Sequence, residues 1–129
     1  MTKTDTLMTI SEMCAAFDVT PRALRFYEAK ELLSPIRQGT RRLFTKADRA
    51  RLKLILRGKR FGVSLEDIRQ VLDLYDRTDT NRAQLVRSID IARNRLAEMK
   101  NQRVDLDEAI CEITEFLARS ETNLAAQPI

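Results

Sequence analysis

The hydrophobic pattern near the start of the chain predicts a short amphipathic helix over residues 10–17. Its apolar positions recur at helical spacing, at Ile10, Met13, Cys14 and Phe17. Thr9 precedes this stripe and Glu12 follows Thr9 by three positions, which is the order of a capping box. The segment is therefore expected to begin as a well-capped helix.

A second short helix is expected over residues 21–30. Thr20 can cap its N-terminus with a hydroxyl, and Pro21 suits the first helical position. Only the turn at 18–20 separates the two helices, so together they predict a helix-turn-helix. In that motif the second helix usually enters the major groove of DNA.

The second helix carries residues that suit contact with nucleic acid. Arg22 and Arg25 share one face, opposite an apolar back, and Tyr27 adds a hydroxyl. A surface helix with solvated arginines has the same spacing, so this stretch alone leaves both interpretations open.

Residues 36–44 are expected to form a small hairpin with Gly39 in its turn. A basic hairpin beside a helix-turn-helix is a wing, and its arginines can reach a flanking groove or phosphates. The candidate wing residues are Arg37, Arg41, Arg42 and Phe44. A solvated loop is the alternative.

Two more helices should follow, near 46–60 and from residue 65 onward. Thr45 and Asp48 repeat the cap pattern, and Leu52, Ile55 and Leu56 form a buried stripe in the first. The second has apolar positions at Ile68, Val71, Leu72 and Tyr75. Lys59 and Arg60 lie at the junction, which could act as a second wing against the DNA backbone.

The apolar spacing in the C-terminal part predicts one long coiled-coil helix. Its seam advances in alternating steps of four and three residues, with Arg103 between Met99 and Leu106. The apolar positions of the seam are Leu85, Ile89, Ala92, Leu96, Met99, Leu106, Ile110, Ile113 and Leu117. A helix from 81 to about 119 has too little other chain to pack on, so it needs a partner, most simply a second copy.

Some features of this helix are left open by the spacing. Arg103 interrupts the seam and either pairs with an acid of the partner or turns outward. The seam does not distinguish parallel from antiparallel pairing. Residues 120–129 are expected to fray or to fold back on the partner. The polar segment 76–80 divides the chain into predicted domains 1–76 and 77–129.

Charge is concentrated in the N-terminal part. Residues 22–60 hold 13 basic and 3 acidic residues, whereas residues 77–129 hold 8 basic and 9 acidic residues. Such a concentration indicates a polyanion partner, with nucleic acid the leading candidate.

Several classes of function are disfavoured. No apolar run approaches a membrane span and the N-terminus lacks a signal peptide, so we expect a cytoplasmic protein without membrane contact. The sequence has no His, no Gly-rich phosphate loop and no nucleophile beside a base, so we expect neither an enzyme nor a cofactor. Cys14 falls on a buried stripe and is expected to be a core thiol. A redox role of Cys111 is left open, although it has no activating basic neighbour and the acidic Glu112 lies beside it.

The motifs, in their order along the chain, resemble those of the MerR family of bacterial transcription regulators. The resemblance lies in Ile10–Met13, Val19–Glu28, Leu32–Pro35, Arg42–Phe44, Thr45–Asp48 and Gly62–Ile68, and it covers about residues 9–75. Within the family, the patterns at 54–60 and 63–68 are most similar to LiuR-like regulators, which are tied to catabolism of branched-chain amino acids and related acyl compounds.

The resemblance implies a mainly α fold, with a winged helix-turn-helix domain and a long dimerisation helix paired in an antiparallel coiled coil. The homodimer would bind a pseudo-palindromic promoter with a long spacer. A small effector would make it bend and untwist that spacer, which realigns the promoter for RNA polymerase.

The resemblance also implies which residues of this chain contact DNA. Arg22 and Arg25 would read bases or phosphates, beside Thr20 and Pro21, and Tyr27 would hydrogen-bond the backbone. Arg41 and Arg42 would be wing contacts, although Arg41 replaces a frequent aromatic and Phe44 a frequent Tyr.

The sequence does not match the metal-binding sites of the metal-sensing family members. Metal-sensing relatives place cysteines at the start of the dimerisation helix, where this chain has 78–81 without Cys. The effector expected is a small organic or acyl compound of unknown identity. The remaining alternatives are a plain repressor or architectural DNA-binding protein, and a coiled-coil adaptor whose basic head binds an acidic protein.

Overall fold

The computed structural model describes residues 6–77 and 82–129, and the side chains of these ranges except 75–77. The chain divides into two compact units, 1–89 and 90–129. The predicted boundary segment at 76–80 and the apolar position Tyr75 fall partly or wholly outside the described side chains, so the division into domains 1–76 and 77–129 stays a prediction.

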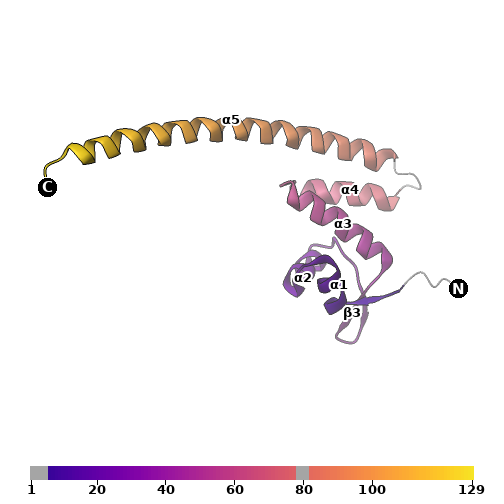
Figure 1. Ribbon diagram of the computed structural model, residues 1–129. Coiled ribbons are helices and arrows are strands. Elements are labelled where there is room, and N and C mark those ends of the chain that lie inside the picture. Colours follow the sequence, from indigo (N-terminus) through magenta and orange to yellow (C-terminus); the bar gives the residue numbers. More distant parts are fainter. Residues whose placement is uncertain (1–5, 78–81) are drawn as a thin grey trace. The chain divides into compact units, whose positions relative to one another are not determined.

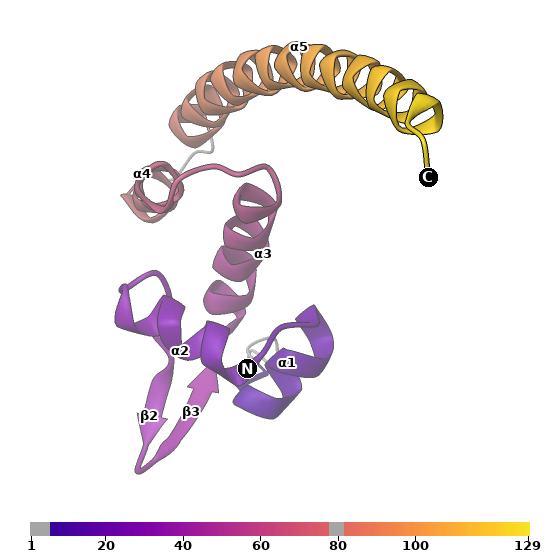
Figure 2. The same cartoon turned by 90° about the vertical axis from the view of Figure 1, so that its left-hand side faces the viewer.

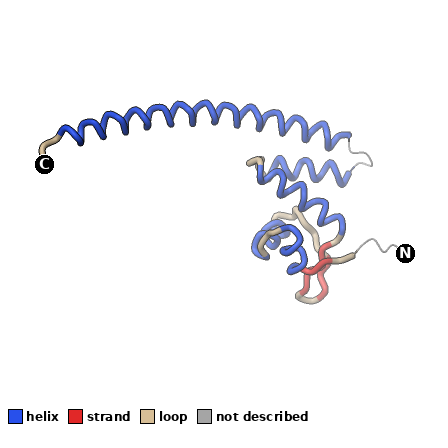
Figure 3. Tube along the Cα trace, in the orientation of Figure 1, coloured by secondary structure: helices blue, strands red, loops and turns tan. Residues whose placement is uncertain are grey.

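Unit 1 combines helices with one small sheet (Figures 1 and 3). Its elements are β1 (Met8–Thr9), α1 (Ile10–Phe17), α2 (Pro21–Ala29), β2 (Ile36–Gln38), β3 (Arg41–Phe44), α3 (Lys46–Arg60), α4 (Leu65–Arg77) and the start of α5 (Arg82–Ala126). The fold is mainly helical, with a helix-turn-helix, a wing and a long C-terminal helix, which confirms the predicted class.

The capping hydrogen bonds expected from the sequence are present at the N-termini of α1 and α2. The Thr9 hydroxyl accepts a hydrogen bond from the amide of Glu12 at 3.2 Å, while the Glu12 carboxylate accepts from the amide of Thr9 at 2.8 Å. Thr20 accepts from the amide of Ala23 at 3.1 Å. Each bond satisfies an amide that the first helical turn leaves unpaired.

The sheet has the strand order β1-β3-β2, and both pairings are antiparallel. The β2–β3 hairpin was expected, and Gly39 occupies its turn with a φ of 62°, a conformation that glycine adopts without strain. Strand β1 was not expected: Met8 and Thr9 pair with Phe44 and Leu43. Two residues carry no strand periodicity, so only the tertiary pairing defines this strand.

One core joins α1, α2, β3, α3 and α4. Eight large side chains are less than 2% exposed: Phe44, Met13, Leu24, Leu32, Leu33, Leu52, Ile55 and Leu72. Leu32 and Leu33, in the segment between α2 and the hairpin, belong to this core. At the α3–α4 packing, a Cβ on Gly58 would lie 2.8 Å from side-chain atoms of Ile68, so either that side chain or the helices would have to shift.

The long helix continues further than expected. The sequence predicted an end near residue 119, followed by a frayed tail, but α5 reaches Ala126. Residues 120–126 contain neither Gly nor Pro, and Pro128 lies just beyond the end. No helix in the described residues is both long and apolar enough to cross a membrane.

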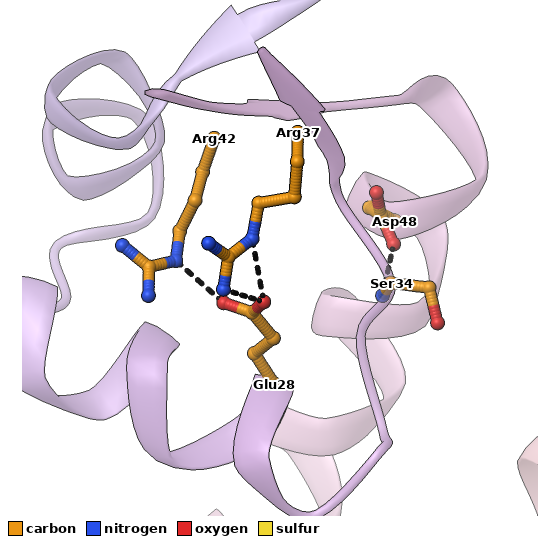
Figure 4. A network of polar contacts seen from close by, with 5 residues as sticks. All are labelled: Glu28, Ser34, Arg37, Arg42 and Asp48. Carbon is orange, nitrogen blue, oxygen red and sulfur yellow. Dashed lines mark hydrogen bonds and ion pairs between the residues drawn. The ribbon is translucent and has the colours of Figure 1, made fainter. Parts of the chain in front are cut away.

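Asp48 is the buried carboxylate that joins α3 to the preceding loop. It is 3% exposed and accepts from the amide of Thr45 at 3.0 Å and from the amide of Ser34 at 3.1 Å. Figure 4 shows the bond to Ser34. Asp48 therefore does more than the predicted capping role, because it also ties down the segment that leads into the wing.

We expect Asp48→Ala to lower the free energy of unfolding by about 1–3 kcal/mol, since it leaves two partly buried amides without acceptors. Asp48→Asn keeps one oxygen and should lose roughly half as much. Urea unfolding would measure both, with the exposed Asp73→Ala as the matched control. Equal stabilities of Asp48→Ala and this control would contradict the assignment.

Candidate nucleic-acid interface

Helix α2 separates its buried and exposed residues cleanly. Leu24 is 0% exposed and Tyr27 is 2% exposed, whereas Arg22 and Arg25 lie on the exposed side. Within the described residues, neither guanidinium group has an intramolecular hydrogen bond or ion pair. Two unpaired guanidinium groups on one short helix form a surface that suits phosphates and base edges.

The wing arginines divide into free and tethered groups. Arg41 is exposed and has no partner among the described residues. Arg37 and Arg42 both bind Glu28 of α2, with Nη2 of Arg37 at 2.7 Å from Oε2 and Nε of Arg42 at 2.5 Å from Oε1. Figure 4 shows both guanidinium groups directed at the one carboxylate.

Glu28 therefore fastens both strands of the hairpin to the second helix of the helix-turn-helix. The hairpin leaves the helices as a projecting ribbon in Figure 2, and a two-stranded ribbon alone is marginally stable. Burial by itself would raise the pKa of Glu28, but the hydrogen bonds and charges of Arg42 and Arg37 outweigh it and hold the pKa below 4.5. The carboxylate stays ionised at neutral pH.

Two predicted DNA contacts need revision. Phe44 is 0% exposed, so the prediction that it contacts DNA is wrong: its ring fills the core between the sheet and the helices. Tyr27 is 2% exposed and belongs mainly to the same core, and the proposed bond from its hydroxyl to DNA stays a prediction. Phe44 belongs to the same cluster of buried residues as Met13, Leu24 and Leu52.

The helix that follows the wing uses part of its basic face internally. Arg51 donates to the carbonyl of Leu32 at 2.9 Å, and Arg49 donates to the carbonyl of Thr6 at 2.7 Å. Lys59 and Arg60, in the last turn of α3, are exposed. The middle of α3 therefore serves the fold, and the proposed contact of Lys59 and Arg60 with the DNA backbone stays a prediction.

Sequence reasoning missed the role of Glu28 and the exposure of Phe26, which is 44% exposed on α2. A signal for Glu28 existed, since it is one of only three acids among residues 22–60. An isolated acid inside a basic segment is a candidate for an internal ion pair. Nothing local indicates which arginines it binds.

A helix-turn-helix with a basic second helix and a basic wing defines a DNA-binding protein of the winged helix class. Residues 8–74 match the family described as "MerR HTH family regulatory protein", and residues 49–116 match "MerR, DNA binding". The chain belongs to the MerR family of DNA-binding transcription regulators, which are not enzymes.

Individual relatives support this assignment. The chain is 33% identical to the HTH-type transcriptional regulator ZntR of Escherichia coli over 99 residues, which cover 75% of this chain and 69% of that one. It is 30% identical to the mercuric resistance operon regulatory protein of Shigella flexneri over 108 residues, covering 81% and 75% of the two chains.

Solved structures agree with the fold. A MerR family regulator from Bacillus cereus aligns with a TM-score of 0.68 and 29% identity, over 90% of this chain and 86% of that one. HiNmlR, described as a MerR family regulator lacking the sensor domain and bound to promoter DNA, aligns with a TM-score of 0.52 and 26% identity, over 93% and 85%.

We expect Glu28→Gln to destabilise the protein by about 1–2 kcal/mol at pH 7, because two arginines lose their charged acceptor. The folded-state pKa is lowered, so the stabilisation is present above the ordinary pKa of 4.5 and disappears as the pH falls through the folded value. Thermal unfolding between pH 7 and pH 3 should show the two proteins converging in acid.

The exposed Glu31→Gln is the matched control and should unfold like the unaltered protein at each pH. A stability difference between Glu28→Gln and the unaltered protein that stays constant down to pH 3 would contradict the ion-pair account.

Proposed function

We propose that the chain acts as a homodimer that binds a pseudo-palindromic promoter and controls transcription by distorting the spacer DNA. The observation that carries this proposal is the pair of exposed, unpartnered arginines on α2 beside a tethered wing. Helix α2 would enter the major groove, and Arg41 would contact flanking DNA, as would Lys59 and Arg60. Arg37 and Arg42 contribute first by fixing the wing, with their remaining N–H groups available for phosphates.

The exposed face of α5 supports self-association. The eight seam residues larger than alanine are between 44% and 60% exposed, and Ala92 is exposed as well. So many apolar residues in one row on a single helix favour a partner that buries them. A second copy provides the complementary seam, and the two DNA-binding units would then be held at a set spacing.

Charge along α5 supports the antiparallel orientation. Residues 82–103 contain six basic and two acidic residues, whereas residues 104–126 contain one basic and six acidic residues. A parallel pair would bring like-charged halves together, and an antiparallel pair brings opposite halves together. The pattern therefore agrees with the orientation that the family resemblance implies.

We propose a small organic or acyl effector, in line with the LiuR-like pattern, and RNA polymerase as an indirect partner through the promoter. The sequence has no His, and its two cysteines lie in different units, with Cys14 half-buried against the core and Cys111 exposed on α5. These features favour a non-metal effector over the mercuric chemistry in the name of one relative.

We expect Arg25→Ala to weaken binding of promoter DNA at least about tenfold, because each half-site loses a charged contact. A gel shift with the fragment upstream of the native operon would measure it, and sedimentation should show that the dimer persists. Arg119→Ala removes the same charge from α5 and serves as the control.

Unchanged affinity of Arg25→Ala would overturn the docking of α2. In vitro transcription with candidate acyl compounds then separates the regulatory modes. An activator raises transcription while it stays bound, whereas a plain repressor or architectural protein does not.

We expect Leu96→Lys to dissociate the dimer, since it places a charge in the middle of the seam. Sedimentation would show the change in mass, and Asn94→Lys, two residues away and outside the seam, should remain dimeric. A stable dimer of Leu96→Lys would show that the seam is assigned wrongly.

A further inference from the structure

Phe26 is an aromatic residue on the outer side of α2 that the core does not account for. It is 44% exposed, while its helix neighbours Leu24 and Tyr27 are almost completely buried. Its ring meets the edge of Tyr27 at a centroid distance of 5.7 Å, and Nζ of Lys30 lies 5.6 Å from its centroid. Nearly half of a large apolar residue still faces water.

The surroundings of Phe26 make it part of a two-part surface. Arg22, Arg25, Phe26 and Ala29 occupy helical offsets of zero, three, four and seven, and all four are exposed. The N-terminal half of this surface is cationic and suits phosphates or guanine. The other half, Phe26 with Ala29, is apolar: neither side chain offers a donor for either, although the ammonium group of Lys30 lies over the Phe26 ring.

The major groove offers one apolar group to such a surface, the C5-methyl of thymine, and Phe and Ala are among the side chains that contact it. We propose that Phe26 is a specificity-determining residue whose ring packs against a thymine methyl in each half-site. This inference rests on the proposed docking of α2 in the major groove.

The expected size of the effect follows from the size of one methyl group. Burying one methyl changes affinity about fourfold. A symmetric dimer makes the contact twice, so removal of both methyls should weaken binding about 15-fold if the half-sites act independently.

The test begins with selection of preferred duplexes from a random library by the full chain. Each thymine of the selected duplex is then replaced by deoxyuridine, which lacks only the methyl group. We expect the unaltered protein to lose about fourfold in affinity at one position in each half-site. Phe26→Ala removes the contact from both protomers, so it should bind the thymine duplex about 15-fold more weakly than the unaltered protein does, and it should ignore the replacement. Phe26→Leu should keep part of the response.

Ile36→Ala is the matched control, because Ile36 is also an exposed apolar residue, at 46%, but lies on β2. It should respond to deoxyuridine as the unaltered protein does. If the unaltered protein ignores every replacement, or if Phe26→Ala keeps the full response, the methyl contact is wrong.

A different set of results would show that α2 does not enter the major groove at all. Full affinity in Arg25→Ala, or a selection without any preferred sequence, would overturn the placement of α2 and the methyl contact with it. Circular dichroism of Phe26→Ala checks that α2 still folds, as expected for a half-exposed side chain.

Discussion

The basic surface depends on two carboxylates placed where its segments meet. Thirteen basic residues among positions 22–60 repel one another and favour an expanded chain. Glu28 binds Arg37 and Arg42 and so joins α2 to both wing strands, while Asp48 binds the amides of Ser34 and Thr45. These contacts hold the helix and the wing in one geometry, and the cations that remain unpaired face outward.

The long helix imposes the second constraint. Its apolar seam stays exposed in a single chain, and its charge changes sign along its length. In the proposed dimer, the seam sets the separation of two identical reading surfaces. Recognition then depends on the spacing between the half-sites as well as on the residues of α2, which suits a regulator that acts by deforming the DNA between them.

Most of the fold could be predicted from local rules. Capping boxes at Thr9 and Thr45 gave the starts of two helices, and the apolar spacing gave their buried faces. The predictions were wrong or incomplete where the structure depends on contacts between distant residues, or where a helix end has no clear signal. Strand β1 has no signal of its own, Phe44 looked like a wing contact until its burial was known, and α5 runs seven residues beyond the predicted end.

The sequence by itself determined the helices, the turn at Gly39, the seam of α5 and the distribution of charge, because caps, periodicity and composition act over a few residues. Only the tertiary structure decided which arginines are free. Glu28 lies nine residues from Arg37 and fourteen from Arg42, and no spacing rule predicts that pairing. The pairing depends on the position of the hairpin beside α2 in the folded chain. Likewise, only the packing of the core shows that Tyr27 is buried while Phe26 stays at the surface.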